Sequence, residues 1–156
     1  MITRMKDPLA SFERSALMAK VRGKGNRSTE FVVERSLRVE RIAGWTKHPG
    51  SVPGKPDFYF PAYKLALFVD GCFWHGCPKC ARNIPTNRRL FWRTKLDGNR
   101  RRDRYIRRLL NRRGYHVMRV WEHHLVDRVW LQRLRDMIRR IERVDSGGCS
   151  GGGGKG

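Results

Sequence analysis

The chain has 156 residues, an ordinary size for one domain and enough for a buried core. Its 35 Lys and Arg residues outnumber 14 Asp and Glu residues, so the formal net charge is +21 and the expected partner is a polyanion, with a phosphate backbone favoured over an acidic membrane surface. No run approaches the roughly 18 apolar residues of a spanning helix, and Met1–Leu17 lacks the apolar region of a signal peptide, so we expect a cytoplasmic protein.

The first third of the chain is predicted to be helical. An N-terminal arm of about residues 1–27 contains a short predicted helix at residues 11–21. The helix that follows is capped by Ser28 or Thr29 and ends near Gly44.

Two strands are predicted next, at residues 56–60 and 64–70, joined by a turn at residues 61–63. The second contains LALFV, an unbroken apolar run typical of a strand that is covered on both faces. In a hairpin, Asp57 at the start of one strand and Asp70 at the end of the other lie at the same edge, which brings two carboxylates together.

The second half begins with an aperiodic loop at residues 71–88, which holds most of the cysteines. A helix at residues 89–113, a strand at 115–121 and an amphipathic helix at 127–143 follow. The inward stripe of the first of these helices is predicted to consist of Trp92, Leu96, Asn99, Asp103, Ile106 and Leu110. An acid on the packed side of an arginine-rich helix requires a reason, and Asp103 is therefore a candidate functional residue.

This order of elements predicts an α/β fold with a central mixed β-sheet flanked by helices. We expect a single domain at residues 1–144 and a disordered Gly/Ser-rich tail at residues 145–156. Cys149 lies in that tail and is not expected to bind metal.

Three cysteines fall within nine residues, at Cys72, Cys77 and Cys80. Thiols stay reduced in the cytosol, and three close thiolates with either His123 or His124 suit tetrahedral zinc. The alternative is three buried cysteines that behave as small apolar residues. A zinc ion with four protein ligands would be structural, so catalysis would need a second metal.

Asp57 and Asp70 suit a magnesium ion, which prefers hard oxygen ligands. Each could instead cap a turn. His75 could serve as a general base or acid in phosphodiester hydrolysis, because an ordinary imidazole titrates near neutrality. It could also be a zinc ligand or an exposed loop residue.

Large aromatic residues adjoin these groups. Phe73 and Trp74 lie in a predicted surface loop, and Trp92 starts the arginine-rich helix. Beside a basic surface, such side chains can stack on bases or wedge between them. The alternative is that they cover the zinc site or the core.

The strings GKPDF, FVDGCFWHGCP, PTNRRLFW, NRRRD and VMRVWEHHL resemble the very short patch repair (Vsr) endonucleases over about residues 14–125. The resemblance implies a restriction-endonuclease-like PD-(D/E)xK fold and a bacterial, nucleoid-associated enzyme. It implies magnesium-dependent nicking of double-stranded DNA on the 5′ side of the thymine in T:G mismatches left by deaminated 5-methylcytosine. It also implies a functional link to a cytosine-5 DNA methyltransferase. We expect a monomer, and contacts with mismatch-repair proteins remain open.

The resemblance also assigns roles to residues. Asp57 matches a magnesium ligand, His75 the catalytic histidine, Asp103 the acid that supports it, and Glu30 a helix acid of the active centre. The structural zinc positions fall on Cys72, Cys77, Cys80 and His123. The positions that intercalate beside the mismatch fall on Phe73, Trp74 and Trp92.

The chain departs from the best-known family pattern at Val69 and Asp70, where that pattern has Thr-His. The Val69 main-chain carbonyl can still bind magnesium together with Asp57, whereas Asp70 adds a carboxylate of open role. In the resulting hypothesis, His75 activates the attacking water and Asp103 orients the imidazole. The rival hypotheses are a nuclease of the same fold without a mismatch requirement and a non-catalytic, zinc-stabilised DNA-binding module.

Overall fold

The computed structural model describes residues 28–80 and 88–147. Predictions for the N-terminal arm, for residues 81–87 and for most of the tail, Cys149 included, lie outside the described residues. The strands form a four-stranded sheet in the order β1 (Thr46–Lys47), β2 (Phe58–Phe60), β3 (Leu65–Asp70) and β4 (His116–Trp121).

The sheet is mixed, as predicted. β2 and β3 are antiparallel, with Phe60 opposite Leu65, and the 3-10 turn η1 (Pro61–Tyr63) joins them, which confirms the predicted hairpin. β3 and β4 are parallel, with Asp70 opposite Trp121, so both strands end at the same edge. Strand β1 is not among the predicted elements, because two exposed residues carry no apolar alternation.

The described helices are a helix at residues 28–39, α2 (Arg89–Arg112) and α3 (Val129–Gly147), with a 3-10 turn η2 (Glu122–Leu125) after β4. None of these helices is long and apolar enough to cross a bilayer. All six residues of the inward stripe predicted for α2 are buried or half-buried, which confirms the prediction.

Two helix ends differ from the prediction. The helix at residues 28–39 ends before Gly44, because Arg41 adopts a left-handed φ of 53° and the Ile42 N–H donates to the Leu37 carbonyl at 2.9 Å. α3 continues to Gly147, so the first three residues of the predicted tail are helical. The Ser146 hydroxyl donates to the Glu142 carbonyl at 2.6 Å in this last turn.

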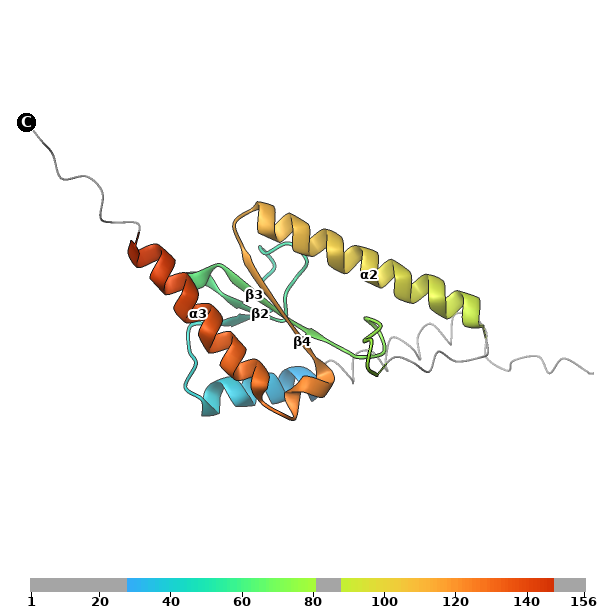
Figure 1. Cartoon of the computed structure of the whole chain (residues 1–156), viewed down its shortest axis with the longest axis horizontal. Helices are drawn as coiled ribbons and strands as arrows, with labels where there is room; N and C mark the ends of the chain where they lie inside the picture. Colours follow the sequence, from blue (N-terminus) through green and yellow to red (C-terminus); the bar gives the residue numbers. More distant parts are fainter. Residues whose placement is uncertain (1–27, 81–87, 148–156) are drawn as a thin grey trace, which may run out of the picture.

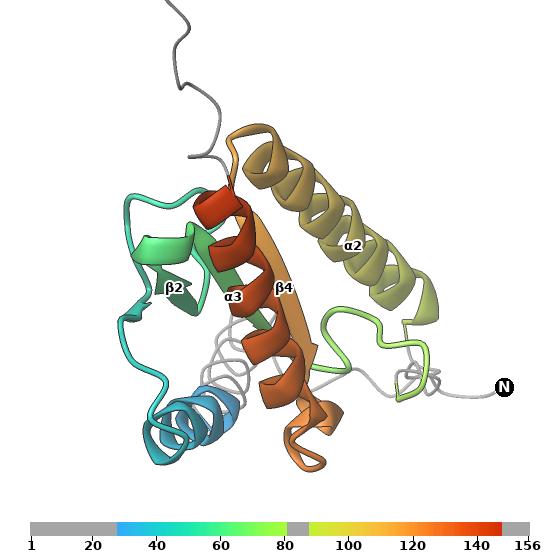
Figure 2. The ribbon, with the colours of Figure 1, turned by 60° about the vertical axis from the view of Figure 1, so that its left-hand side comes forward.

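Helices cover both faces of the sheet (Figures 1 and 2). On one face, Leu65 and Leu67 of β3 pack with Val33 of the helix at residues 28–39 and with Trp130 and Leu134 of α3. On the other face, α2 contributes the core residues Leu110 and Ile106, which pack with the two β3 residues of opposite orientation, Ala66 and Phe68. Alternation along β3 therefore separates two cores, and the second one faces α2.

Candidate active site and metal centre

The candidate sites lie where β3 and β4 end. Because the strands are parallel and Asp70 is opposite Trp121, the loop at residues 71–80 and the turn η2 leave the sheet side by side. The Cys72 N–H donates to a Glu122 carboxylate oxygen at 3.2 Å and ties the loop to η2. Residues about fifty positions apart in the sequence thereby become neighbours.

The loop contains a glycine that the packing requires. Gly76 has a φ of 64°, and a β-carbon there would lie 2.5 Å from the Arg100 guanidinium. Arg100 Nη2 donates to the Gly76 carbonyl at 2.9 Å, so α2 holds the loop against the sheet edge. A side chain at this position would be strained and would displace that contact.

The first site, which we call the cysteine–histidine cluster, consists of Cys72, Cys77, Cys80 and His123, whose ligand atoms lie within 4.8 Å of one another. The three Sγ atoms lie 3.2, 3.6 and 3.5 Å from His123 Nδ1. Tetrahedral zinc, with Zn–S near 2.3 Å and Zn–N near 2.0 Å, separates sulfur and nitrogen by about 3.5 Å. The cluster therefore fits zinc, and it contains His123 rather than His124.

Burial raises the pKa of the Cys72 thiol to about 12. A bound cation would favour the thiolate form of Cys72 against this burial. That the cluster holds zinc stays a prediction.

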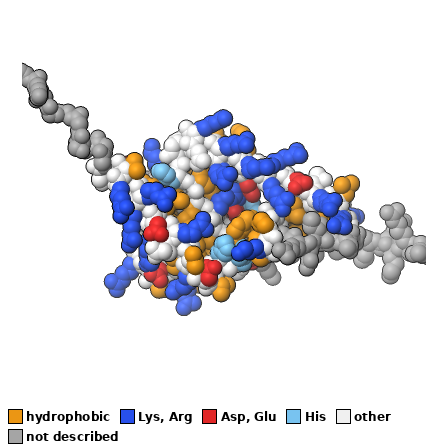
Figure 3. Space-filling model, in the orientation of Figure 1, with side chains coloured by type: hydrophobic (Ala, Val, Ile, Leu, Met, Phe, Trp, Pro, Cys, Tyr) orange, Lys and Arg blue, Asp and Glu red, His pale blue; other side chains and the backbone are white. Residues whose placement is uncertain are grey.

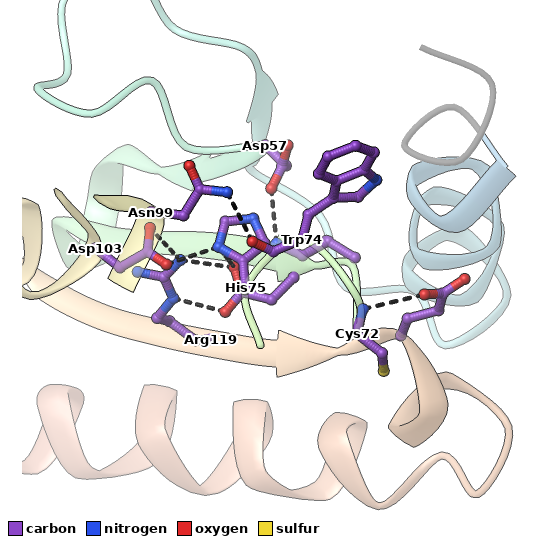
Figure 4. A network of polar contacts seen from close by, with 10 residues as sticks. Asp57, Cys72, Trp74, His75, Asn99, Asp103 and Arg119 are labelled. Carbon is purple, nitrogen blue, oxygen red and sulfur yellow. Dashed lines mark hydrogen bonds and ion pairs between the residues drawn. The ribbon is translucent and has the colours of Figure 1, made fainter. Parts of the chain in front are cut away.

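The second site, the acid–histidine cleft, has a volume of about 260 Å³ and is lined in part by Asp57, Asp70, His75, Asp103 and Arg119. These side chains come from the residue before β2, the end of β3, the loop, α2 and β4. Figure 4 shows Asp57, His75, Asp103 and Arg119 gathered around one space. Four of the five residues predicted for the catalytic site thus lie together, and Glu30 is not among the residues that line this cleft. The roles themselves stay predictions.

The imidazole of His75 is fixed by Asp103. Asp103 lies on the inward stripe of α2, and its Oδ2 is 2.6 Å from His75 Nδ1 (Figure 4). Burial lowers the pKa of His75, but the hydrogen bond to Asp103 and the charge of Asp70 outweigh it, and the net shift is upward. Burial raises the pKa of Asp103, yet His75 and the Arg119 charge outweigh it, so this carboxyl stays ionised.

Asp57 is held at the cleft wall by a main-chain hydrogen bond. Its Oδ2 accepts from the Val69 N–H at 2.6 Å. Burial raises the pKa of Asp57 to about 6, and the nearby charge of Glu30 adds to the effect against the lowering by Val69. An ionised carboxylate here is electrostatically unfavourable until a cation joins it.

Asp57 also belongs to a second group of potential metal ligands, with Glu30 and His48, whose ligand atoms lie within 4.8 Å of one another. His48 Nε2 lies 3.0 Å from a Glu30 carboxylate oxygen. The two carboxylates are the hard oxygen ligands that magnesium prefers, so the donor set fits that ion. No motif or periodicity in the sequence points to His48, which lies in a loop.

Asp70 has a different environment from the one predicted. Its two oxygens accept from Nε and Nη2 of Arg119 at 2.6 and 2.7 Å. Arg119 was missed from the sequence. One feature of the sequence could have pointed to it. Arg119 lies in the predicted strand YHVMRVW, two residues after Val117, so the two side chains are on the same face of the strand.

The aromatic residues of the loop and α2 form one group. Ring centroids of Phe73 and Trp74 are 5.2 Å apart, those of Phe73 and Trp92 5.4 Å, and those of Trp74 and Trp92 6.1 Å. All three side chains are half-buried. Asn99 of α2 donates to the Trp74 carbonyl at 2.7 Å and so holds the loop beside the helix.

Positive charge surrounds these sites. In the view of Figure 3, Lys and Arg side chains are spread over the visible face, with few acids among them. A mixed sheet with carboxylates and a His–Asp pair in one cleft of a basic surface is an arrangement suited to metal-dependent phosphodiester hydrolysis. The fold and the cleft therefore define the class as an α/β protein of nuclease type.

Comparison with known proteins identifies the family. Residues 6–82 match the family model of the DNA mismatch endonuclease Vsr. The type II nicking enzyme V.XorIIP of Xanthomonas oryzae pv. oryzae is 37% identical over 135 residues, which cover 86% of this chain and 98% of that protein. The DNA mismatch endonuclease Vsr of Escherichia coli strain K12 is 32% identical over 138 residues, covering 78% of this chain and 88% of that protein. The type II nicking enzyme V.NaeI of Lentzea aerocolonigenes is 49% identical over 69 residues, covering 44% of this chain and 41% of that protein.

The chain belongs to the Vsr endonuclease family, which confirms the resemblance. It is thus a Vsr-type nuclease.

Proposed function

We propose that this nuclease nicks double-stranded DNA on the 5′ side of the thymine in T:G mismatches left by deaminated 5-methylcytosine, with magnesium as its cofactor. Family membership and the name of the Escherichia coli relative support the mismatch substrate. The net charge of +21 supports a DNA partner. The observation that carries the catalytic part is the His75–Asp103 pair in the same cleft as Asp57.

Magnesium would be held by Asp57 with the Val69 main-chain carbonyl, and Glu30 offers a further carboxylate. When bound, it supplies a positive charge that polarises the scissile phosphodiester. Asp57 is held in place for this role by the Val69 N–H, which engages Oδ2 and leaves Oδ1 available to a metal ion.

His75 acts as the general base. Asp103 accepts a hydrogen bond from Nδ1–H, so the neutral imidazole presents an unprotonated Nε2, which can take a proton from the attacking water. The ionised Asp103 carboxylate holds the ring orientation and stabilises the imidazolium that forms. Water and scissile phosphate must then meet in the cleft in line with the leaving oxygen.

The remaining assignments belong to the same proposal. The cysteine–histidine cluster holds a structural zinc ion and fixes the loop that carries His75. Phe73, Trp74 and Trp92 insert beside the mismatch, as apolar side chains do when they wedge between base steps. The enzyme acts as a single-domain monomer in the bacterial cytoplasm, in the target sequence of a cytosine-5 DNA methyltransferase.

The test is a nicking assay on end-labelled duplexes of one sequence that carry T:G, T:A or C:G at the central pair, with and without magnesium. We expect cleavage of the T-containing strand of the T:G duplex alone, and only with magnesium. Asp57→Ala should lose nicking and keep DNA binding. Asp136→Ala, a change at an α3 carboxylate whose side chain is 51% exposed, is the matched control and should keep both.

Each contrary outcome has a definite meaning. Equal nicking of T:G and T:A duplexes would identify a nuclease without a mismatch requirement. Binding without nicking of any duplex would identify a zinc-stabilised DNA-binding module. Retained nicking by Asp57→Ala would remove the proposed metal site.

A further inference from the structure

Arg119 is the most heavily engaged side chain of the acid–histidine cleft. Its Nε and Nη2 donate to the two oxygens of Asp70 at 2.6 and 2.7 Å, and Nη2 lies 3.0 Å from Asp103 Oδ1. The side chains of Arg119 and Asp70 are 20% and 5% exposed. A bidentate pair of this kind is stronger and more directional than a surface ion pair.

The sheet register explains why these groups meet. Arg119 of β4 is opposite Phe68 of β3, and Asp70 follows two residues later on the same face. The guanidinium carbon of Arg119 lies over the Phe68 ring, 5.2 Å from its centre, in a cation–π contact. Stacking and the bidentate contact together leave the guanidinium little freedom to move.

The contacts divide the two oxygens of Asp103 between two partners. Oδ2 faces His75 Nδ1 at 2.6 Å, and Oδ1 faces Arg119 Nη2 at 3.0 Å. A carboxylate held at one oxygen alone could rotate about its bond to the helix, whereas one held at both keeps a single orientation. Asp103 thus links the His75 ring to Arg119, and His75 Nδ1 also lies 3.7 Å from Asp70 Oδ1 (Figure 4).

The same contacts change the expected role of Asp70. Each of its oxygens already accepts a charge-assisted hydrogen bond from Arg119, so this carboxylate is committed to an ion pair and is not a free metal ligand.

We propose that Arg119 is a positioning residue of the nuclease centre, which holds Asp70 as an ion pair and aims the Asp103 carboxylate at His75. This inference rests on the proposed function for its kinetic consequence, but the positions of the side chains can be tested without it.

The experiment compares Arg119→Met, Arg119→Lys and the double variant Asp70→Asn/Arg119→Met with the wild type. Arg139→Met, a change at an α3 arginine with a 62% exposed side chain, is the matched control. Single-turnover nicking of the preferred duplex is measured at several DNA concentrations, together with thermal unfolding. We expect Arg119→Met to lower the rate constant by about 100-fold with little change in the DNA concentration for half-saturation, as for a lost orienting contact.

The double variant separates positioning from mere stability. Arg119→Met leaves the Asp70 charge buried without its partner and should unfold at a lower temperature. Asp70→Asn/Arg119→Met removes that charge and should recover the melting temperature while nicking stays slow. Arg119→Lys should recover part of the rate. Recovery of both properties in the double variant would overturn the proposal.

A second readout does not need activity. In NMR spectra, the His75 Nδ1 proton should give a low-field resonance in the wild type, as expected for its short contact with Asp103, and should lose it in Arg119→Met but not in Arg139→Met. Persistence of this resonance in Arg119→Met would overturn the proposal. A wild type that nicks no DNA would sink the proposed function instead, and the NMR comparison would still decide the role of Arg119.

Discussion

The loop at residues 71–80 supplies two sites of opposite chemistry. Cys72, Cys77 and Cys80 form a cluster of soft ligands with His123, whereas His75, between them in the sequence, faces the hard carboxylates of the acid–histidine cleft. The cluster offers four potential ligands, which would leave a tetrahedral metal ion no position for substrate. The cleft is open, with a volume of about 260 Å³, and its polar side chains come from five different segments.

The two sites differ in their expected contribution: the cysteine–histidine cluster to stability and the acid–histidine cleft to catalysis. A metal ion bound by all four side chains would stabilise the fold by tying the loop to η2, and this would hold His75 in place. The cleft does the reverse, because it gathers charges that the fold must accommodate: burial raises the pKa of Asp57 to about 6. Stability should therefore depend on the cluster and activity on the cleft, and the following predictions break or sharpen that contrast.

The largest effect is expected from Cys77→Ala. Loss of one thiolate should release zinc, whose binding contributes about 10 kcal/mol in small zinc domains, and should lower the melting temperature and nicking together. Metal content by mass spectrometry and thermal unfolding check this. Cys149→Ala, a change outside the predicted ligand set, should affect neither. One retained equivalent of zinc in Cys77→Ala would contradict the assignment.

Asp57→Asn should lose nicking and gain stability. The carboxyl of Asp57 titrates near pH 6 in the folded chain instead of 3.8, so its ionisation weakens the fold progressively as the pH rises from about 4 to 6. At pH 7 without added divalent ions, we expect the variant to be more stable by about 3 kcal/mol, since the pKa of Asp57 is raised by about two units and one unit corresponds to about 1.4 kcal/mol.

Denaturant unfolding of Asp57→Asn and wild type at pH 4 and pH 7 measures this difference. It should be near zero at the lower pH and fully present at the higher one. If the variant and the wild type were equally stable at pH 4 and also at pH 7, burial in the cleft would not disfavour the ionised Asp57 carboxylate.

His75→Ala should lower the nicking rate by about 10² to 10⁴-fold, as for loss of a general base. Zinc content and melting temperature should stay close to those of the wild type, because the imidazole faces the cleft and not the cluster. Single-turnover nicking and metal analysis of the same sample test the separation of the two sites. Loss of zinc from this variant would show that they are not separate.

Trp74→Ala should weaken binding of a T:G duplex by about 1 to 3 kcal/mol, the usual value of one base-stacking aromatic. Trp74→Phe keeps a stacking ring and is the matched control. Fluorescence anisotropy with T:G and T:A duplexes of one sequence measures the effect. An equal loss for both duplexes would argue against a role in mismatch recognition.

The smallest effect is expected from Asp70→Asn on the magnesium concentration that nicking requires. Since Arg119 already engages both Asp70 oxygens, the magnesium concentration for half-maximal nicking should stay unchanged, even though the rate falls. Glu30→Gln should raise that concentration, because Glu30 belongs to the group with Asp57. A raised magnesium requirement in Asp70→Asn would restore Asp70 as a ligand.

The amino-acid sequence alone determined the features that depend on local spacing. The inward stripe of α2, Asp103 included, follows from the helical repeat, and the β2–β3 hairpin follows from two apolar runs separated by a turn. The three cysteines of the cluster are close because they are close in the chain. Membership in the Vsr family was likewise readable from short motifs.

Only the tertiary structure decided which distant residues became partners. The parallel register of β3 and β4 selected His123 as the neighbour of the cysteines and set Arg119 beside Asp70 and Asp103. Such pairings depend on how two strands align across about fifty residues, and no local repeat encodes that alignment. Arg119, which neutralises Asp70, was therefore present in the sequence, but only the register of β3 and β4 identified it as the partner of Asp70.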